Sequence, residues 1–421
     1  MLVFIVATGG LFIFFSSKNS VKISNFAQTL GEISGIMAEE KAANPNADLP
    51  PQKRLENPPE IIKAIYATGW SAGSVRKSDY LIKLIKDTEL NAIIIDIKDY
   101  TGKVSYHTNI ETVNKYGAEE IRIIKPNELI KKFHDAGIYV IARMAIFQDQ
   151  ILAKSRPDLA LGSLSSGEQW KDYKGLMWID PAAKESWDYN IAIAKDALER
   201  GFDEINFDYI RFASDGNLDD IKHPFWDGKT LKRYIIRDFF KYLRQSMPDA
   251  KLSADLFGLT TVNYGDVGIG QNIDDAYHYF DAIAPMVYPS HYNKGFNGHP
   301  NPALEPYDVV YTSMLEANKR LSQYLIKAEN STSTEKYLVK KPQLRPWLQD
   351  FDLGTVYTAD MVRAQINAVY AATGLCSSVA ATGTVAERSA QVCNPASGGK
   401  LGGWMLWDPA NNYTKDAFLA E

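Results

Sequence analysis

The feature that most constrains the fold is a repeated alternation of short, β-rich apolar runs with longer segments of helical periodicity. It begins at residue 61 and continues almost to the C-terminus, with runs at 63–68, 92–97, 138–144, 204–212, 251–257, 282–288, 343–349 and 402–407. Alternating strands and helices favour a parallel sheet, and eight such units are the number that closes a TIM barrel. The sequence therefore predicts an α/β protein with one (β/α)8 barrel over residues 61–421.

Long loop insertions are expected in this barrel, because the span exceeds the roughly 250 residues that are typical of the fold. The surplus falls at 145–178, 212–235, 289–340 and 373–400. The alternative is an open, doubly wound sheet. It is disfavoured because residues 69–73 (GWSAG), after the first run, lack the phosphate-binding pattern G-x-G-x-x-G.

The N-terminal segment predicts export. Residues 2–15 are uncharged and largely apolar, too short for a typical spanning helix but of the length of a signal-peptide core. Residues 1–20 are therefore expected to be a signal peptide or a membrane anchor, and a buried helix of the fold is the third alternative. Residues 21–60, rich in proline near their end, predict a linker. We expect an extracytoplasmic protein of the cell envelope or the medium, with membrane contact only through this segment.

Charge and cysteine content exclude several classes of protein. The chain has 46 basic and 51 acidic residues without a basic cluster, so nucleic acid is not an expected partner. The two cysteines, Cys376 and Cys393, are too few for a disulfide scaffold or a cysteine-based zinc site. In an exported protein they are expected to form a disulfide, and otherwise they are free thiols. The six scattered histidines show no zinc-binding spacing, and no metal or cofactor is predicted.

Charged and aromatic residues gather at the C-terminal ends of the predicted strands, where such barrels carry their active sites. Along 204–210, Asn206 and Asp208 share one face and apolar residues share the other, so this pair is expected to point into the barrel. The same alternation directs Asp255 and Asp96 inward. Arg143, on the strand between, is the expected partner of Asp96 or Asp208, because a carboxylate in a barrel mouth requires pairing or a function.

This set of residues suits the hydrolysis of sugars, which requires one protonated and one ionised carboxyl group beside the glycosidic bond. We assign Asp208 as nucleophile or base and Asp255 as general acid, with these roles interchangeable, and Asp96 as a third catalytic candidate. Aromatic rings would stack on the sugar and polar groups would bind its hydroxyls. The expected substrate-binding residues are Arg143, Tyr66, Trp70, Asn206, Arg211, Tyr288, His291, Trp347 and Trp407.

Several segments resemble a bacterial family called the "putative glycosyl hydrolase domain". Among them are YATGWSAG (66–73), GFDEINFDYIRFASDG (201–216), SADLFGLTT (253–261) and GWMLWDP (403–409). The resemblance covers about 61–415 and implies an extracytoplasmic, polysaccharide-active TIM barrel with Asp208 and Asp255 as leading catalytic candidates. The chitinase-like motif D-G-x-D-x-D-x-E is a more distant comparison, and its acid–base Glu falls on Ile210. That mechanism therefore does not transfer.

Two other functions remain open from the sequence. One is a non-catalytic carbohydrate-binding barrel at the cell surface, and the other is a metal-dependent hydrolase or deacetylase. Two inward carboxylates at a separation suited to hydrolysis, about 5–5.5 Å for retention or 6.5–9.5 Å for inversion, would favour the glycosidase. Carboxylates buried in arginine pairs without an open cleft would favour binding. The sequence does not specify the polysaccharide, its linkage, the stereochemical outcome or the oligomeric state.

Overall fold

The computed structural model describes residues 4–7, 10–13, 47–331, 338–339, 341–376, 383–393 and 401–420. The chain divides into two compact units, Met1–Asp48 and Leu49–Glu421. In the first, strands β1 (Phe4–Ala7) and β2 (Gly10–Ile13) pair antiparallel. Residues 21–46 of the predicted linker lie outside the described residues.

Membrane contact stays a prediction. Within the described ranges, every helix is too short or too polar to cross a lipid bilayer. The expected signal peptide or anchor falls on residues 1–20, of which the structure describes the backbone of β1 and β2 alone.

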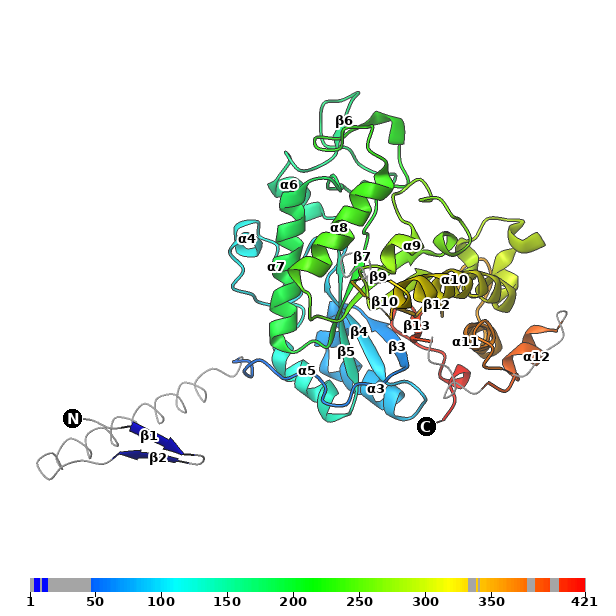
Figure 1. The fold of residues 1–421 in the computed structure, drawn as a ribbon, viewed down its shortest axis with the longest axis horizontal. Helices are drawn as coiled ribbons and strands as arrows, with labels where there is room; N and C mark the ends of the chain where they lie inside the picture. Colours follow the sequence, from blue (N-terminus) through cyan, green and yellow to red (C-terminus); the bar gives the residue numbers. More distant parts are fainter. Residues whose placement is uncertain are drawn as a thin grey trace, which may run out of the picture. The chain divides into compact units, whose positions relative to one another are not determined.

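The second unit is built around a closed barrel of eight parallel strand positions (Figure 1), which confirms the predicted (β/α)8 fold. The seventh position is split into two short strands by Arg345 and Pro346, since proline has no N–H to donate to a neighbour. Around the barrel the order is β3 (Ile62–Ala67), β4 (Ala92–Lys98), β5 (Tyr139–Ala145), β7 (Glu204–Asp208), β9 (Leu252–Phe257), β10 (Ala282–Met286), β11 (Gln343–Leu344) with β12 (Trp347–Gln349), and β13 (Gly403–Trp407), which pairs with β3.

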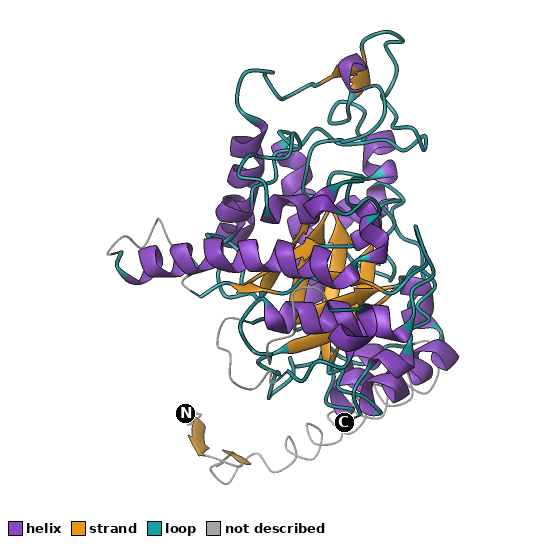
Figure 2. Ribbon diagram, turned by 90° about the vertical axis from the view of Figure 1, so that its right-hand side faces the viewer, coloured by secondary structure: helices purple, strands orange, loops and turns teal. Residues whose placement is uncertain are grey.

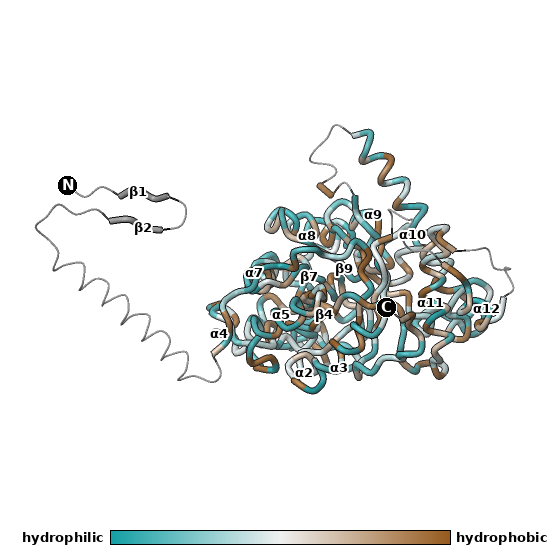
Figure 3. The backbone as a smooth tube through the Cα atoms, turned by 90° about the horizontal axis from the view of Figure 1, so that it is seen from below, coloured by the Kyte–Doolittle hydropathy of each residue, from teal (hydrophilic) through white to brown (hydrophobic). Residues whose placement is uncertain are grey.

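Helices surround the strands (Figure 2). In chain order they are α2 (Gly69–Gly73), α3 (Val75–Lys86), α4 (Glu111–Lys115), α5 (Pro126–Asp135), α6 (Gln150–Ser155), α7 (Lys184–Arg200), α8 (Lys232–Ser246), α9 (Ile273–Ala276), α10 (Pro306–Glu329), α11 (Ala359–Ala371) and α12 (Val385–Ser389). Figure 3 shows hydrophilic stretches along the outer helices α7 and α8, as expected for helices that pack one face on a barrel.

The insertions carry structure of their own. Strands β6 (Gly162–Ser163) and β8 (Ile221–Lys222) pair antiparallel and so join the insertions after β5 and β7, above α7 in Figure 1. The third insertion contains the 24-residue helix α10. In the fourth, Cys376 and Cys393 are joined by a disulfide.

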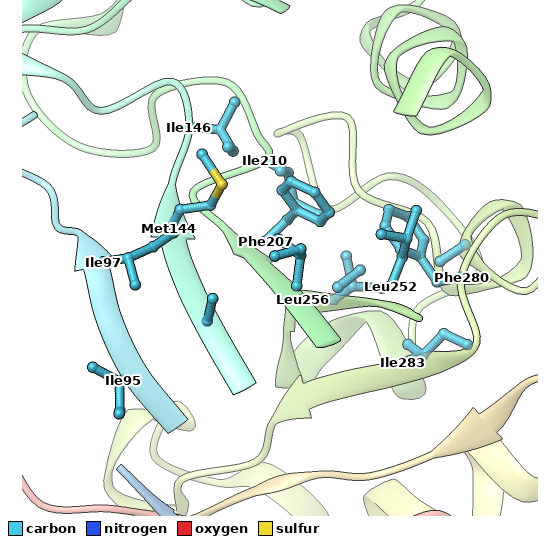
Figure 4. Packing of buried hydrophobic residues seen from close by; sticks show 14 of the residues in the cluster. Ile95, Ile97, Met144, Ile146, Phe207, Ile210, Leu252, Leu256, Phe280 and Ile283 are labelled. Atoms are coloured by element: carbon cyan, nitrogen blue, oxygen red, sulfur yellow. The ribbon is translucent and has the colours of Figure 1, made fainter. Parts of the chain in front are cut away.

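Alternation along the strands separates two apolar layers. Outward side chains fill the space between strands and helices, and Figure 4 shows Ile95, Ile97, Met144, Phe207 and Leu252 among them. Inward side chains form a smaller cluster that includes Ile94, Ile141 and Met405. The polar residues on the inward face therefore stand on a packed floor, which positions the site described below.

Part of the segment expected to be a linker lies against the N-terminal end of the barrel. The carbonyl of Leu49 accepts a hydrogen bond from Asn127 at 2.6 Å. The backbone N–H of Gln52 donates to Arg200, and that of Leu55 donates to the Asp203 carboxylate at 2.7 Å. The Leu55 side chain packs on the inward apolar cluster. Residues 49–60 thus belong to the barrel unit.

Candidate active site

The register of the strands brings the inward polar residues to one level. Asp96 on β4 lies opposite Arg143 on β5, and Arg143 lies opposite Asn206 on β7. Asp208 and Asp255 follow two residues beyond Asn206 and its neighbour Ser253, toward the C-terminal ends of their strands. Four adjacent strands therefore aim a connected set of polar side chains into the mouth of the barrel.

One guanidinium contacts all three carboxylates. Arg143 donates through Nη1 to Asp96 at 2.6 Å, through Nη2 to Asp208, and reaches Asp255 from Nε at 3.4 Å. The four side chains are at most 9% exposed. Because one positive charge faces three acids with little water between them, this cluster favours the uptake of a proton.

Asp255 is the most deeply buried of the three acids. Burial and the neighbouring Asp208 raise its pKa to about 7. Its Oδ1 accepts hydrogen bonds from Trp347 Nε1 at 2.7 Å and from Asn206 Nδ2 at 2.8 Å. Among the described residues, Oδ2 is reached only by Arg143 Nε, at 3.4 Å, and is the less strongly hydrogen-bonded oxygen of the two.

Asp96 is held by two donors. Tyr66 donates its hydroxyl proton to Oδ2 at 2.5 Å, and Arg143 binds Oδ1. Burial raises the pKa of Asp96, although the charge of Arg143 and the hydrogen bond from Tyr66 oppose this. The pKa of Tyr66 is itself raised well above its usual value by burial and by Asp96, so the Tyr66 hydroxyl keeps its proton at any ordinary pH.

Asp208 ends its strand at a special backbone position. The sequence predicted a strand to residue 212, but β7 ends at Asp208 and Tyr209 has φ 54°. That left-handed conformation is uncommon for a bulky residue and costs free energy. It turns the N–H of Tyr209 back to Asp208 Oδ1, at 2.6 Å. Together with Arg143 on Oδ2, this hydrogen bond fixes the orientation of the carboxylate.

A cavity of about 810 Å³ opens above these groups, a volume that suits a small-molecule or oligosaccharide ligand. Asp96, Asp208 and Arg143 line it together with aromatic side chains. Tyr66 and Trp407 are stacked there with ring centres 3.9 Å apart. Predicted contacts Trp70, Tyr288 and His291 line the same cavity.

Other predicted site residues lie beneath or beside the cavity and are not among the side chains that line it. Asn206 and Asp255 form a buried layer below Arg143, and Trp347 is 1% exposed with its indole N–H on Asp255. Trp347 is therefore core and not an open platform. The Arg211 guanidinium lies over the rings of Trp178 and Phe257 and donates to the Phe212 carbonyl.

The structure adds residues to the cavity that the sequence did not single out. They include Asp99, Tyr100, Arg122, Lys174 and Tyr209. Asp99 and Tyr100 directly follow β4, so the position of that strand end was a usable signal for them. Arg122 and Lys174 come from long connections, for which the sequence carried no such signal.

A possible metal-ligand group lies elsewhere. Within the described residues, His299, Glu305 and Asp308 have ligand atoms close enough together to hold an ion. These residues do not line the cavity, and Arg388 already pairs with Asp308. The group therefore makes no contribution to the chemistry of the barrel mouth.

A match to a protein-family model shows which family the chain belongs to. The family model described as "Putative glycosyl hydrolase domain" matches residues 64–375. The chain belongs to this family. The match confirms the resemblance predicted from the motifs, and with the barrel it supports the predicted glycosidase. No curated protein matches the chain.

Solved structures are similar to this chain to different degrees. A hypothetical protein from Ruminiclostridium thermocellum is 41% identical over 45% of this chain and 96% of its own, with a TM-score of 0.43. The PgaB (BpsB) glycoside hydrolase domain from Bordetella bronchiseptica is 12% identical over 85% and 99%, with a TM-score of 0.52. The α-galactosidase TtGalA from Thermus thermophilus is 13% identical over 86% and 60%, with a TM-score of 0.45. At 12% identity, the likeness to the Bordetella domain shows the fold alone.

Proposed function

We propose that this protein hydrolyses glycosidic bonds in a cell-envelope or extracellular polysaccharide, by carboxylate catalysis at the C-terminal face of the barrel. The observation that carries the proposal is that two acids, Asp96 and Asp208, line one cavity of about 810 Å³ beside stacked aromatic rings. Glycosidases require two carboxyl groups that both reach the scissile bond.

We assign the roles of the carboxyl groups first by whether they line the cavity and then by their pKa. Asp208 acts as nucleophile or base, held by Arg143 and the Tyr209 N–H. Asp96 lines the cavity and has a raised pKa. In its protonated form the proton lies on Oδ2, where the Tyr66 hydroxyl turns to accept it, and Asp96 then gives this proton to the leaving oxygen. Asp255, to which the sequence assigned the proton, is 1% exposed. In this proposal it keeps a proton behind the site and positions Arg143.

The cellular location is part of the proposal. An apolar N-terminal run followed by a proline-rich segment supports an exported protein, either secreted or anchored at the membrane. An oxidising compartment would also favour the disulfide between Cys376 and Cys393.

The test is turnover by the full-length protein on amylose, dextran, cellulose, xylan, chitin and peptidoglycan, with analysis of the products. Asp208→Asn and Asp96→Asn should each lower kcat by about 100-fold or more, the usual contribution of a general acid or base. Asp203→Asn is the matched control, because this aspartate is also buried but binds Leu55 and Val140 at the opposite end of the barrel. Wild-type turnover by both site variants would refute the assignment.

A non-catalytic carbohydrate-binding barrel is the second candidate function. It is favoured by the observation that all three carboxylates are engaged by Arg143. Affinity electrophoresis in gels that contain the same glycans separates the two. Retardation of the wild-type protein without any hydrolysis product would favour the binding protein.

A further inference from the structure

Helix α2 presents an exposed tryptophan beside the cavity. Trp70 is 59% exposed, although it is the second residue of a short helix in which Gly69 and Ala72 are buried. It lines the same cavity as Asp96 and Asp208. A large aromatic side chain left in water at the edge of a site loses the free energy of its burial unless a ligand covers it.

Two glycines fix this helix against the segment that follows β4. A Cβ atom on Gly69 would lie 2.5 Å from Ser105 Oγ, and one on Gly73 would lie 1.9 Å from the Arg122 carbonyl oxygen. Only glycine permits this approach at Gly73, because the carbonyl of Arg122 is backbone and cannot move aside. The helix that carries Trp70 is thus seated at both of its ends.

A braced arginine supports the indole. The Arg122 guanidinium lies 5.5 Å from the centre of the Trp70 ring. It is only 5% exposed and is itself held by Asp99 and Glu120, each at 2.5 Å. A cation over the ring stabilises the aromatic side chain in one orientation. More than half of Trp70 nevertheless remains open to solvent.

Tyr100 extends this exposed aromatic surface. It follows β4, lines the same cavity and is 45% exposed. Trp70 and Tyr100 are thus two exposed aromatic side chains of the cavity that also holds Asp96 and Asp208, and we call this pair the aromatic ledge. Aromatic rings with polar neighbours suit ligands that have both apolar faces and hydroxyl groups, such as sugar rings.

We infer that this ledge binds the non-reacting sugar units of a polysaccharide chain, so that the substrate is a polymer extending out of the cavity and not a mono- or disaccharide. The inference rests on the proposed function and adds to it a binding surface for the sugar units that do not react. Binding energy from units far from the scissile bond acts on KM when substrate and transition state use it equally.

The experiment compares Trp70→Ala with the wild-type full-length protein on the polysaccharide that it cleaves and on a size ladder of oligosaccharides from that polymer. We expect about a tenfold rise in KM for the polymer, with kcat unchanged, and no change for the shortest cleaved oligosaccharide. Tyr80→Ala is the matched control. Tyr80 is 41% exposed and has Lys77 over its ring at 4.9 Å, but it does not line the cavity.

Each result is decisive. An equal KM for the polymer in Trp70→Ala and wild type would overturn the polymer ledge and leave the hydrolase intact. A KM that rises equally for every chain length would also overturn it, because the effect would then lie at the scissile bond. Absence of turnover on all six glycans of the panel would overturn the proposed function and, with it, this inference.

Discussion

Replacing Asp255 by asparagine should change how the stability of the protein depends on pH. In the folded protein, burial and Asp208 raise the pKa of this carboxyl from an ordinary 3.8 to about 7. The folded state therefore holds a proton that the unfolded chain releases between these two values. Since the native state then binds more protons, the free energy of unfolding falls as pH rises through this interval.

The size of the effect follows from the same two values. One pKa unit corresponds to about 1.4 kcal/mol, so the interval corresponds to at most about 4 kcal/mol. Asparagine cannot ionise, yet it keeps an oxygen to accept the hydrogen bonds from Trp347 and Asn206. Relative to wild type, Asp255→Asn should gain stability between pH 4 and pH 8, up to this amount.

Urea unfolding at pH 4 and pH 8 measures this difference for the wild type and the variant. Acids outside the Arg143 cluster, such as Asp350 with a pKa of about 6, contribute equally to both proteins and cancel. Asp238→Asn, at a side chain that is 58% exposed, serves as control and should shift neither value. If Asp255→Asn and wild type differ by the same free energy at both pH values, the buried proton does not exist.

Three further predictions concern the same barrel. Tyr66→Phe removes a hydrogen bond that lowers the pKa of Asp96. The pH at which kcat/KM falls on the alkaline side should therefore rise by about one unit. If this pH is unchanged, Asp96 is not the proton donor. Arg143→Met leaves buried acids without their counter-charge, so the free energy of unfolding in urea should fall by about 3–5 kcal/mol at pH 7 and by less at pH 4. The same fall at both pH values would contradict this prediction. Replacing Cys376 and Cys393 by serine removes a disulfide between residues 17 positions apart and should lower the free energy of unfolding, measured by thermal denaturation, by about 3 kcal/mol. If a reductant leaves the melting temperature of the wild-type protein unchanged, the disulfide is absent.

Periodicity was sufficient to predict the barrel, because the two faces of each strand differ in polarity. The alternation along 204–208 places Asn206 and Asp208 inward, as the structure has them. The expectation that Arg143 would pair with an acid on a neighbouring strand follows from the same logic, and it pairs with two. The other strand ends were predicted to within two residues, whereas the strand expected to run to residue 212 ends at Asp208.

The depth of each side chain within the barrel mouth could not be predicted, because the alternation of polar and apolar residues along a strand shows only whether a side chain points inward or outward. Asp255 faces inward but lies under Arg143. Arg211 was placed on a strand that in fact stops at Asp208, since the left-handed backbone of Tyr209 is not encoded by any local pattern such as glycine. Asp180 and Pro181 are typical of a helix start, yet α7 begins at Lys184. The Asp180 carboxylate accepts hydrogen bonds from the N–H groups of Ala182, Phe225 and Trp226.

The contacts of residues 49–60 have a practical consequence for anyone who prepares this enzyme. A shortened protein that starts at residue 61, where the strand pattern begins, would lack the hydrogen bonds to Asn127, Arg200 and Asp203. It would also lack the Leu55 side chain, which packs on the inward apolar cluster of the barrel. Recombinant versions freed of the N-terminal apolar run should therefore keep Leu49 and everything after it. A loss of solubility on trimming twelve more residues would then reflect an opened barrel floor and not a failure of the catalytic face.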